Sequence, residues 1–306
     1  MLVIWRFVDG NRAHEKQSAA LISGLGLCLG AGRLDCRVID CRAVKLSFFG
    51  GVPEALRQLP RPDLLIGAGH RTHWPLLRAR GLCGGRSVVI MQPSLPLRWF
   101  DFVIVPEHDR PPAVENVILT QGALAEPLPD IPFEADRGLL LLGGPSRHFQ
   151  WDAAKVTAVA EQLLKRPLKW VVADSRRTPQ GVLTQFIGSG AELVSWQETS
   201  PGWLAEQMAR SGHIWVTGDS VSMVSEALQS RAQVGVITLP SRRPNNKIRG
   251  AIQRLLDQEL VTEQLDEAAC SALQQLPRKP LNQQVSCARA LLRRCGIKST
   301  LEKGDG

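Results

Sequence analysis

Short runs of aliphatic and β-branched residues alternate with longer segments of helical periodicity along most of the chain. Most of these runs lack the strict alternation of apolar and polar residues that a half-exposed strand shows, as expected of strands covered on both faces. The alternation predicts βαβ units with parallel sheets. The predicted strands are 2–7, 36–40, 63–68, 87–92, 102–106, 116–121, 139–142, 169–173, 191–196, 213–217 and 234–239.

A proline-rich stretch divides the strand pattern into two sets. It carries Pro127, Pro129 and Pro132 and few periodic apolar residues. The chain of 306 residues is also about twice the usual length of one domain. We therefore expect an α/β protein with two Rossmann-like doubly wound domains that face a cleft, and a helical C-terminal tail. The predicted boundaries are 1–125 for the first domain, 126–136 for the linker, 137–245 for the second domain and 246–306 for the tail. In the tail, the apolar spacing predicts helices over 247–258, 263–276 and 283–294.

Composition and charge indicate which kinds of molecule the protein binds. Lys and Arg number 37 against 29 Asp and Glu, which gives a formal net charge of +8 and favours phosphates or an anionic membrane surface. The basic C-terminal segments lack interleaved aromatic residues, so no nucleic-acid partner is expected. Seven cysteines without a CxxC pair indicate reduced thiols rather than a disulfide framework or a zinc site. With no export signal visible in the sequence, we expect a cytoplasmic chain, at most peripheral to the inner membrane.

Polar residues that follow strands are the candidates for chemistry, because ligands of open α/β sheets gather at the carboxyl ends of the strands. His70 could take a proton from a hydroxyl group, since imidazole titrates near neutral pH. The His70/His73 pair lacks a third ligand at metal spacing, so no metal is expected. Ordinary loops and capped helix starts remain equally good interpretations of these segments. The candidates in the first half are Asp9, His14, Gly69, His70, His73, His108 and Asp109.

The second half offers residues suited to a diphosphate. Paired glycines after a strand predict a turn to which a ligand comes close, and two arginines precede a helix predicted to start at Thr178 and Pro179. Near Thr217, Asp219 or Ser220 is expected to cap the next helix and expose its N–H groups to an anion. Glu226 lies four residues after Ser222 and could accept the hydroxyls of a ribose, although an ordinary first-turn acid is the plain alternative. These candidates are Gly143, Gly144, Ser175, Arg176, Arg177, Thr178, Asp219, Ser220, Ser222 and Glu226.

Four stretches in the same order resemble the mitochondrial fission factor family named for elongated mitochondria in plants, most members of which are bacterial proteins without an assigned reaction. They are GAGHRTH (67–73), FDFVIVPEHD (100–109), DSRRTP (174–179) and TGDSVSMVSEA (217–227). The first loop, from Asp9 to Gln17, is similar to the family's Asp-Gly-x-x-Gly-His-x-x-Gln, with Ala13 in place of the second glycine.

That family is similar to two-domain glycosyltransferases of the GT-B type, including the lipid-linked N-acetylglucosaminyltransferase of peptidoglycan synthesis. The resemblance implies that the second domain grips the diphosphate of a nucleotide sugar and that Glu226 holds its ribose. The first domain would receive the acceptor, with His70 as the base. A nucleotide sugar would be the substrate, and no cofactor is implied.

Three functions follow from the sequence as alternatives. The first is a glycosyltransferase with a cell-envelope lipid or polysaccharide as acceptor. The second is a non-enzymatic protein that recruits a partner to a membrane, as the plant resemblance implies. The third is a nucleotide-sugar epimerase, since one architecture carries several reactions.

Overall fold

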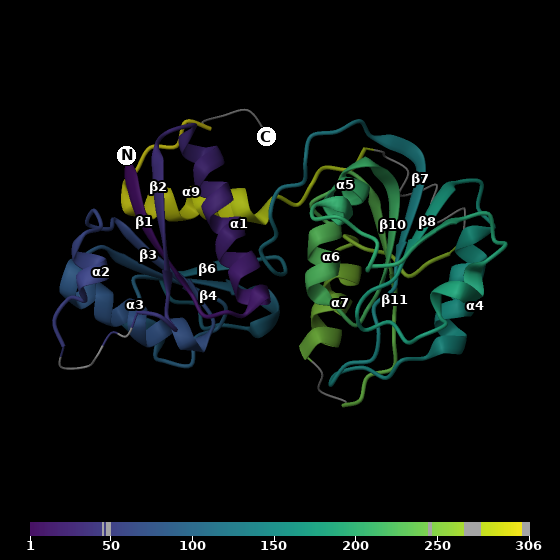
Figure 1. Cartoon of the computed structure of the whole chain (residues 1–306), viewed down its shortest axis with the longest axis horizontal. Coiled ribbons are helices and arrows are strands. Elements are labelled where there is room, and N and C mark those ends of the chain that lie inside the picture. Colours follow the sequence, from purple (N-terminus) through teal and green to yellow (C-terminus); the bar gives the residue numbers. More distant parts are fainter. Residues whose placement is uncertain (45, 47–49, 244–246, 266–276, 302–306) are drawn as a thin grey trace. The chain divides into compact units, whose positions relative to one another are not determined.

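The computed structural model describes residues 1–44, 46, 50–243, 247–265 and 277–301. The chain divides into two compact units (Figure 1). Unit 1 joins Met1–Pro127 with Asn282–Gly306, and unit 2 is Leu128–Leu281. The chain therefore leaves unit 1, builds unit 2 and returns.

Unit 1 contains a six-stranded sheet in the order β2-β1-β3-β4-β5-β6, in which every neighbouring pair is parallel. Its apolar strands are covered on both faces, which explains why their sequences lack alternation. The strands are β1 (Leu2–Val8), β2 (Leu34–Asp40), β3 (Leu64–Ala68), β4 (Arg86–Ile90), β5 (Phe102–Pro106) and β6 (Val117–Thr120).

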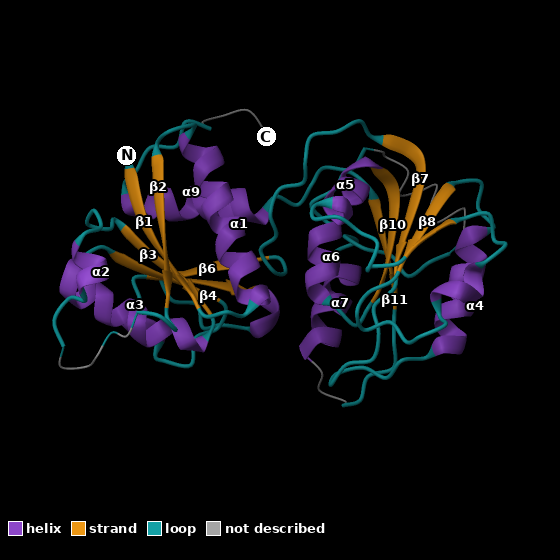
Figure 2. Cartoon of the chain, viewed as in Figure 1, coloured by secondary structure: helices purple, strands orange, loops and turns teal. Residues whose placement is uncertain are grey.

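Helices cover both faces of this sheet (Figure 2). On one face, α1 (Arg12–Leu29) and α9 (Gln283–Cys295) bury residues such as Leu21 and Leu291. On the other, α2 (Glu54–Arg57) and α3 (His70–Cys83) bury Leu56 and Leu76. Two 3-10 helices, η1 (Leu97–Trp99) and η2 (Glu107–Asp109), follow β4 and β5.

Unit 2 contains a five-stranded parallel sheet in the order β11-β10-β7-β8-β9. Helices α5, α6 and α7 contribute Met208, Val224 and Leu255 to the core on one face, while α4 contributes Val156 on the other (Figure 2). The elements are β7 (Glu134–Leu141), α4 (Ala153–Leu164), β8 (Lys169–Ala173), η3 (Leu183–Phe186), β9 (Glu192–Val194), α5 (Trp203–Arg210), β10 (Ser211–Thr217), α6 (Val221–Ala227), β11 (Gln233–Ile237) and α7 (Lys247–Asp257).

Each of the eleven predicted strands overlaps an observed one, and the prediction of two parallel α/β sheets is confirmed. The sheet orders also locate two topological switch points, where consecutive connections leave in opposite directions. In unit 1 the switch lies between β1 and β3, and in unit 2 between β7 and β10. Ligands of open α/β sheets bind outside the carboxyl ends of the strands at such points.

The C-terminal helices do not form the separate tail that the sequence predicted. Helix α7 buries Ile252 and Leu255 in unit 2, whereas α9 packs against α1 in unit 1. Gly24 permits that contact, because a Cβ atom there would collide with the carbonyl oxygen of Gln284. The observed connection also ends earlier than the predicted linker of 126–136, because β7 begins at Glu134. Most of the helix predicted over 263–276 lies outside the described residues.

Candidate functional site

The switch point of unit 1 brings together the loop after β1 and the loop after β3. Asp9 follows β1, and its side chain is only 3% exposed. His14 lies in the first turn of α1, which begins after the N-cap Asn11. Asn11 accepts a hydrogen bond from the Ala13 N–H at 3.0 Å and so fixes the direction in which the helix leaves the loop.

Asp9 and His14 form an oriented pair. His14 Nδ1 lies 3.1 Å from Asp9 Oδ2, while Asp9 Oδ1 accepts the N–H of Asn11 at 3.0 Å. A carboxylate can only accept, so Nδ1 of a neutral His14 carries the proton and Nε2 keeps its lone pair. The His14 side chain is 17% exposed. This pair is therefore an imidazole base with its tautomer set by a buried acid.

Gly69 makes room for the ring of His14. It has φ +83° and stands immediately before α3, and a Cβ atom there would collide with His14 Nδ1. Only glycine satisfies both the positive φ and the close approach at low cost. Sequence reasoning placed Gly69 among the candidates for its small size, and the structure gives it a definite neighbour. His70, the predicted base, is the exposed first residue of α3.

The remaining histidines of unit 1 have different surroundings. His73 is 2% exposed, lies 3.4 Å from the Ser94 hydroxyl through Nδ1, and packs edge-on against Phe100. Burial, together with the nearby His70 and His14, lowers the pKa of His73 to about 4. His108 and Asp109 lie in η2 after β5, a strand that β4 separates from β3.

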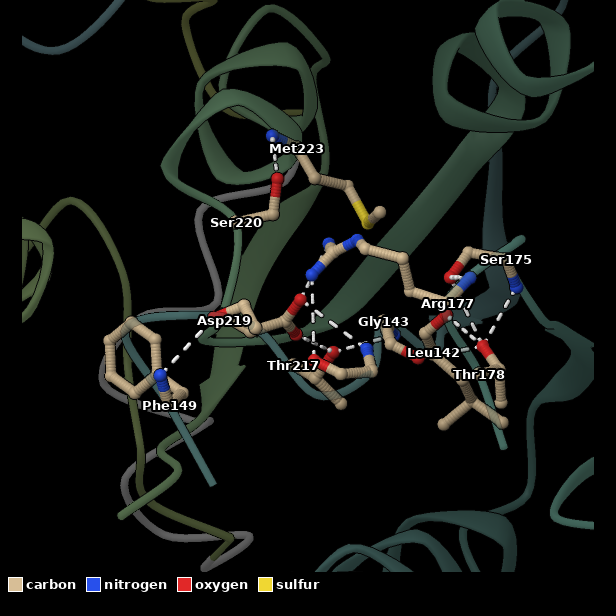
Figure 3. A network of polar contacts seen from close by, with 12 residues as sticks. Leu142, Gly143, Phe149, Ser175, Arg177, Thr178, Thr217, Asp219, Ser220 and Met223 are labelled. Atoms are coloured by element: carbon tan, nitrogen blue, oxygen red, sulfur yellow. Dashed lines mark hydrogen bonds and ion pairs between the residues drawn. The ribbon is translucent and has the colours of Figure 1, made fainter. Parts of the chain in front are cut away.

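At the switch point of unit 2, Asp219 is the centre of a buried polar network (Figure 3). Its side chain is fully buried. Asp219 Oδ1 accepts the hydroxyl of Thr217 at 2.7 Å, and Oδ2 accepts the Gly144 N–H at 3.3 Å. Thr217 in turn accepts the Gly143 N–H at 2.7 Å. The network ties the loop after β7 to the loop after β10.

Arg177 completes this network from the loop after β8. Its guanidinium lies 2.6 Å from Asp219 Oδ2, and its side chain is 40% exposed. The paired glycines have a packing role here, and the ligand approach that the sequence predicted for them stays a prediction. A Cβ atom on Gly143 would collide with the Asp219 carboxylate, and one on Gly144 would collide with the backbone carbonyl of Arg177.

Thr178 does not cap a helix, so that prediction is wrong. The residues after it form turns, and the next helical element is η3. The Thr178 hydroxyl instead lies 2.9 Å from the Leu142 carbonyl oxygen and 2.7 Å from that of Gly143, and it accepts the Ser175 N–H at 2.8 Å (Figure 3). Thr178 thus joins the β7 and β8 loops. Arg176 is exposed beside it.

The prediction for the loop after β10 is confirmed in its local geometry. Ser220 is the N-cap of α6 and accepts the Met223 N–H at 3.4 Å. Ser222 is exposed, and Glu226 is half-buried one turn further along. Asp219, the alternative cap, is occupied by the network described above.

Trp196 is a residue that the sequence analysis missed. It lies two residues after the end of β9, and its backbone N–H donates to Asp174 Oδ1 at 2.6 Å. The residue is 40% exposed. An exposed indole at the carboxyl edge of a parallel sheet is a stacking surface for a planar group. The signal was present in the sequence, because Trp196 ends a predicted strand.

Among the residues that the structure describes, no group of three or more His, Cys, Asp or Glu side chains is arranged to hold a metal ion. None of the helices in the same part of the chain is long and apolar enough to cross a bilayer.

Solved structures with this fold cover nearly the whole chain. UDP-bound MnaA of S. aureus is 14% identical, with a TM-score of 0.53 and coverage of 95% of this chain and 95% of that one. A putative UDP-N-acetylglucosamine 2-epimerase of Listeria monocytogenes is 11% identical, with a TM-score of 0.55 and coverage of 94% and 91%. UGT2 of Phytolacca americana, in complex with UDP-2-fluoro-glucose and pterostilbene, is 7% identical, with a TM-score of 0.51 and coverage of 96% and 90%.

At these identities the similarity shows the fold alone, which is the two-unit architecture of GT-B glycosyltransferases and related epimerases. The sequence itself gives the family. The model of the mitochondrial fission ELM1 family matches residues 13–295, and the chain belongs to that family. The comparison with curated proteins gives no match.

Proposed function

We propose that the chain is a glycosyltransferase that moves a sugar from a nucleotide sugar to a hydroxyl group of a cell-envelope lipid or polysaccharide. The observation that carries this proposal is the Asp9–His14 pair at the switch point of unit 1. A histidine whose tautomer is set by a buried carboxylate is the arrangement that enzymes use for a general base.

His14, rather than His70, is the base in this proposal. As the acceptor hydroxyl attacks the anomeric carbon, its proton passes to His14 Nε2. The bond between that carbon and the diphosphate oxygen breaks, and the diphosphate leaves with the electron pair. Asp9 stabilises the imidazolium that forms, through the contact of 3.1 Å at Nδ1. His70 has no such orienting carboxylate among the contacts of the described residues.

Unit 2 supplies the groups suited to the donor. Arg176 and Ser222 are exposed residues in the segments that follow β8 and β10, and a guanidinium and the start of a helix are groups that attract a diphosphate. Glu226 would accept the ribose hydroxyls, and the Trp196 indole would stack on the base. Arg177 acts indirectly, because its ion pair with Asp219 holds the loops together. The nucleotide sugar is a substrate, and the proposed reaction needs no resident cofactor.

The test is an assay of purified protein with a panel of nucleotide sugars and extracted envelope lipids or polysaccharides, in which release of nucleoside diphosphate is measured. We expect His14→Ala and Asp9→Asn to lower kcat about 10²- to 10⁴-fold, the range for loss of a general base or its orienting acid. Nucleotide-sugar affinity, measured by calorimetry, should change little. The matched control is His70→Ala, which removes an exposed imidazole at the same sheet edge.

Three other outcomes of this assay would contradict the proposal or the assignment of the base. Loss of turnover in His70→Ala but not in His14→Ala would return the role of base to His70. Conversion of the sugar without an acceptor would indicate an epimerase. Absence of binding to every nucleotide sugar would refute the proposal and favour the recruitment protein.

A further inference from the structure

Two segments at the carboxyl edge of the unit 2 sheet pair with each other and carry basic side chains. The segment 143–152 follows β7, and the segment 238–243 follows β11. Phe149 in the first segment and Ser241 in the second form an antiparallel bridge. The two segments therefore lie side by side at the edge where open α/β sheets bind ligands.

Arg242 fastens one segment to the other. Its backbone N–H donates to the His148 carbonyl oxygen at 2.9 Å. Its side-chain Nε donates to the carbonyl oxygens of Ser146 and Phe149, at 3.1 and 3.2 Å. The Nη groups have no hydrogen-bond partner among the described residues. A guanidinium that is held in place through Nε can offer its other N–H groups to a ligand.

Two more arginines lie in the same segments. Arg147 is in the loop that holds Arg242, and its Nε donates to His148 Nε2 at 2.8 Å, while Arg243 directly follows Arg242. All three arginines are exposed, and no ion pair within the described part of the chain neutralises them. The two segments contain one carboxylate, that of Asp152, which caps α4. We call Arg147, Arg242 and Arg243 the β7–β11 cluster.

The position of the cluster matches the sugar end of the proposed donor. The strand order β11-β10-β7-β8-β9 places Trp196 on one side of the switch point and the cluster on the other. Figure 3 agrees, because Phe149 lies on the opposite side of Asp219 from Thr178. From β9 to β11 is four strand spacings, or about 19 Å. A nucleotide sugar with its base on Trp196 and its diphosphate at the switch point therefore extends its sugar toward the cluster.

The charge of the cluster indicates what kind of sugar it binds. A neutral sugar offers only hydroxyl groups, whereas a guanidinium suits a carboxylate, with which it forms two parallel hydrogen bonds. The diphosphate already has Arg176, on the β8 side of the switch point, in the proposed function. The cluster is therefore available to a second anionic group on the same donor.

We propose that the donor is a nucleotide-linked hexuronic acid, whose carboxylate binds the β7–β11 cluster. This inference rests on the proposed function and names the class of its donor sugar. Arg242 forms the paired hydrogen bonds with the carboxylate, because its guanidinium is fixed by two backbone carbonyls. Arg147 and Arg243 attract the same charge from neighbouring positions.

Calorimetry of the full chain with nucleotide sugars that differ only at C6 tests this. The pairs are UDP-glucuronate with UDP-glucose, UDP-galacturonate with UDP-galactose, and GDP-mannuronate with GDP-mannose. In at least one pair the acid should bind at least about tenfold more tightly than the neutral sugar, as expected of a charge-assisted contact. Added salt should reduce this preference.

Two variants test the residues of the cluster. Arg147→Gln combined with Arg243→Gln removes two charges from exposed positions and should reduce the preference for the acid at least about fivefold. Arg242→Lys keeps the charge but loses the planar fork, so it should reduce the preference about threefold or more. Unchanged melting temperatures would show that the fold is intact in each variant.

The matched control is Lys165→Gln combined with Lys279→Gln. It also removes two charges from exposed positions of unit 2. Lys165 lies just before β8, and Lys279 lies beside Arg278, whose N–H donates to the Arg231 carbonyl oxygen just before β11. Both lysines are thus near the amino ends of strands, and the control should keep the preference of the unaltered chain.

The inference is overturned if no acidic sugar binds more tightly than its neutral counterpart, or if the control loses as much preference as the cluster variants. Equal binding of acidic and neutral sugars would refute this inference and leave the proposed function standing. If none of these compounds binds, the inference also fails, and the wider panel of nucleotide sugars then decides the proposed function separately.

Discussion

The two switch points use a buried aspartate after a strand in opposite ways. In unit 1, Asp9 contacts Nδ1 of the His14 ring at 3.1 Å, and the other ring nitrogen, Nε2, lies 3.5 Å from the side-chain nitrogen of Asn11. In unit 2, Asp219 is surrounded by the permanent cation of Arg177, the Thr217 hydroxyl and the Gly144 N–H. A carboxylate that orients an imidazole can take part in proton transfer. A carboxylate that is held by three fixed donors from different loops joins those loops together.

The largest effect on stability is expected at Gly144. Gly144→Ala forces a Cβ atom into the backbone of Arg177, which cannot turn away as a side chain can, so we expect a loss of about 3 kcal/mol or more in the free energy of unfolding. Gly69→Ala meets a side chain, that of His14, and should cost about 1–2 kcal/mol while displacing the base. Urea denaturation measures both changes.

Gly26→Ala is the control for these two glycines, because a Cβ atom at this position in α1 meets nothing within 4 Å. It should stabilise the chain by about 0.5–1 kcal/mol. If Gly144→Ala and Gly69→Ala lowered the free energy of unfolding equally, the proposed difference between the switch points of unit 2 and unit 1 would be wrong.

The two aspartates provide the next comparison. Asp219→Asn removes a fully buried charge that contacts the Arg177 guanidinium, the Thr217 hydroxyl and the Gly144 N–H. We expect the free energy of unfolding to fall by about 2–3 kcal/mol. Asp9→Asn should lower the free energy of unfolding by about 1 kcal/mol, since it weakens one hydrogen bond to a side chain that is 17% exposed and so remains partly hydrated. Thermal melting of both variants at pH 7.5 measures the difference. A larger loss for Asp9→Asn would reverse the assignment of roles.

The buried His73 predicts that the stability of unit 1 depends on pH. Its pKa is lowered to about 4 in the folded chain against about 6.5 when unfolded, so below pH 6.5 the unfolded chain binds more protons. The stability that this group contributes is therefore present above pH 6.5 and falls as the pH drops toward 4, with a loss of about 2 kcal/mol between pH 7.5 and pH 5.0.

Urea midpoints at pH 7.5 and 5.0 test this, with His73→Gln as the variant that should lose most of the difference. An unchanged difference in His73→Gln would assign the acid sensitivity to other groups.

The smallest effects concern the two helix caps. Asn11→Ala removes a 3.0 Å bond at the start of α1 and should cost about 1 kcal/mol, while Ser220→Ala removes a 3.4 Å bond and should cost about 0.5 kcal/mol. Differential scanning calorimetry resolves shifts of this size. If the Ser220 variant lost more, its hydroxyl would have a role beyond the cap.

Most of the fold was predictable because strands and helix starts depend on neighbouring residues. The apolar runs of 102–106 and 169–173 predicted strands with the observed bounds, and the segment near Thr217 predicted a cap at Asp219 or Ser220, of which Ser220 is the observed one. Thr178 shows the limit. Its sequence, followed by proline, is a good helix start, yet its hydroxyl bonds to Leu142 and Gly143, which lie about 35 residues earlier in the chain.

The candidate site shows the same limit. Asp9, His14 and His70 were all visible after strands, but the sequence favoured His70 by resemblance. The proposed function assigns the base to His14 instead, because the folded loop places it beside the buried Asp9 and the small Gly69.

By itself, the sequence determined two sets of parallel strands and the polar residues that end them, since periodicity and capping are local properties. Tertiary structure alone decided which strand ends meet at the switch points, that Arg177 is engaged by Asp219, and that α9 returns to α1. The physical reason is distance along the chain. These contacts join residues tens to hundreds of positions apart, and their stability comes from burial and shape that no single segment contains.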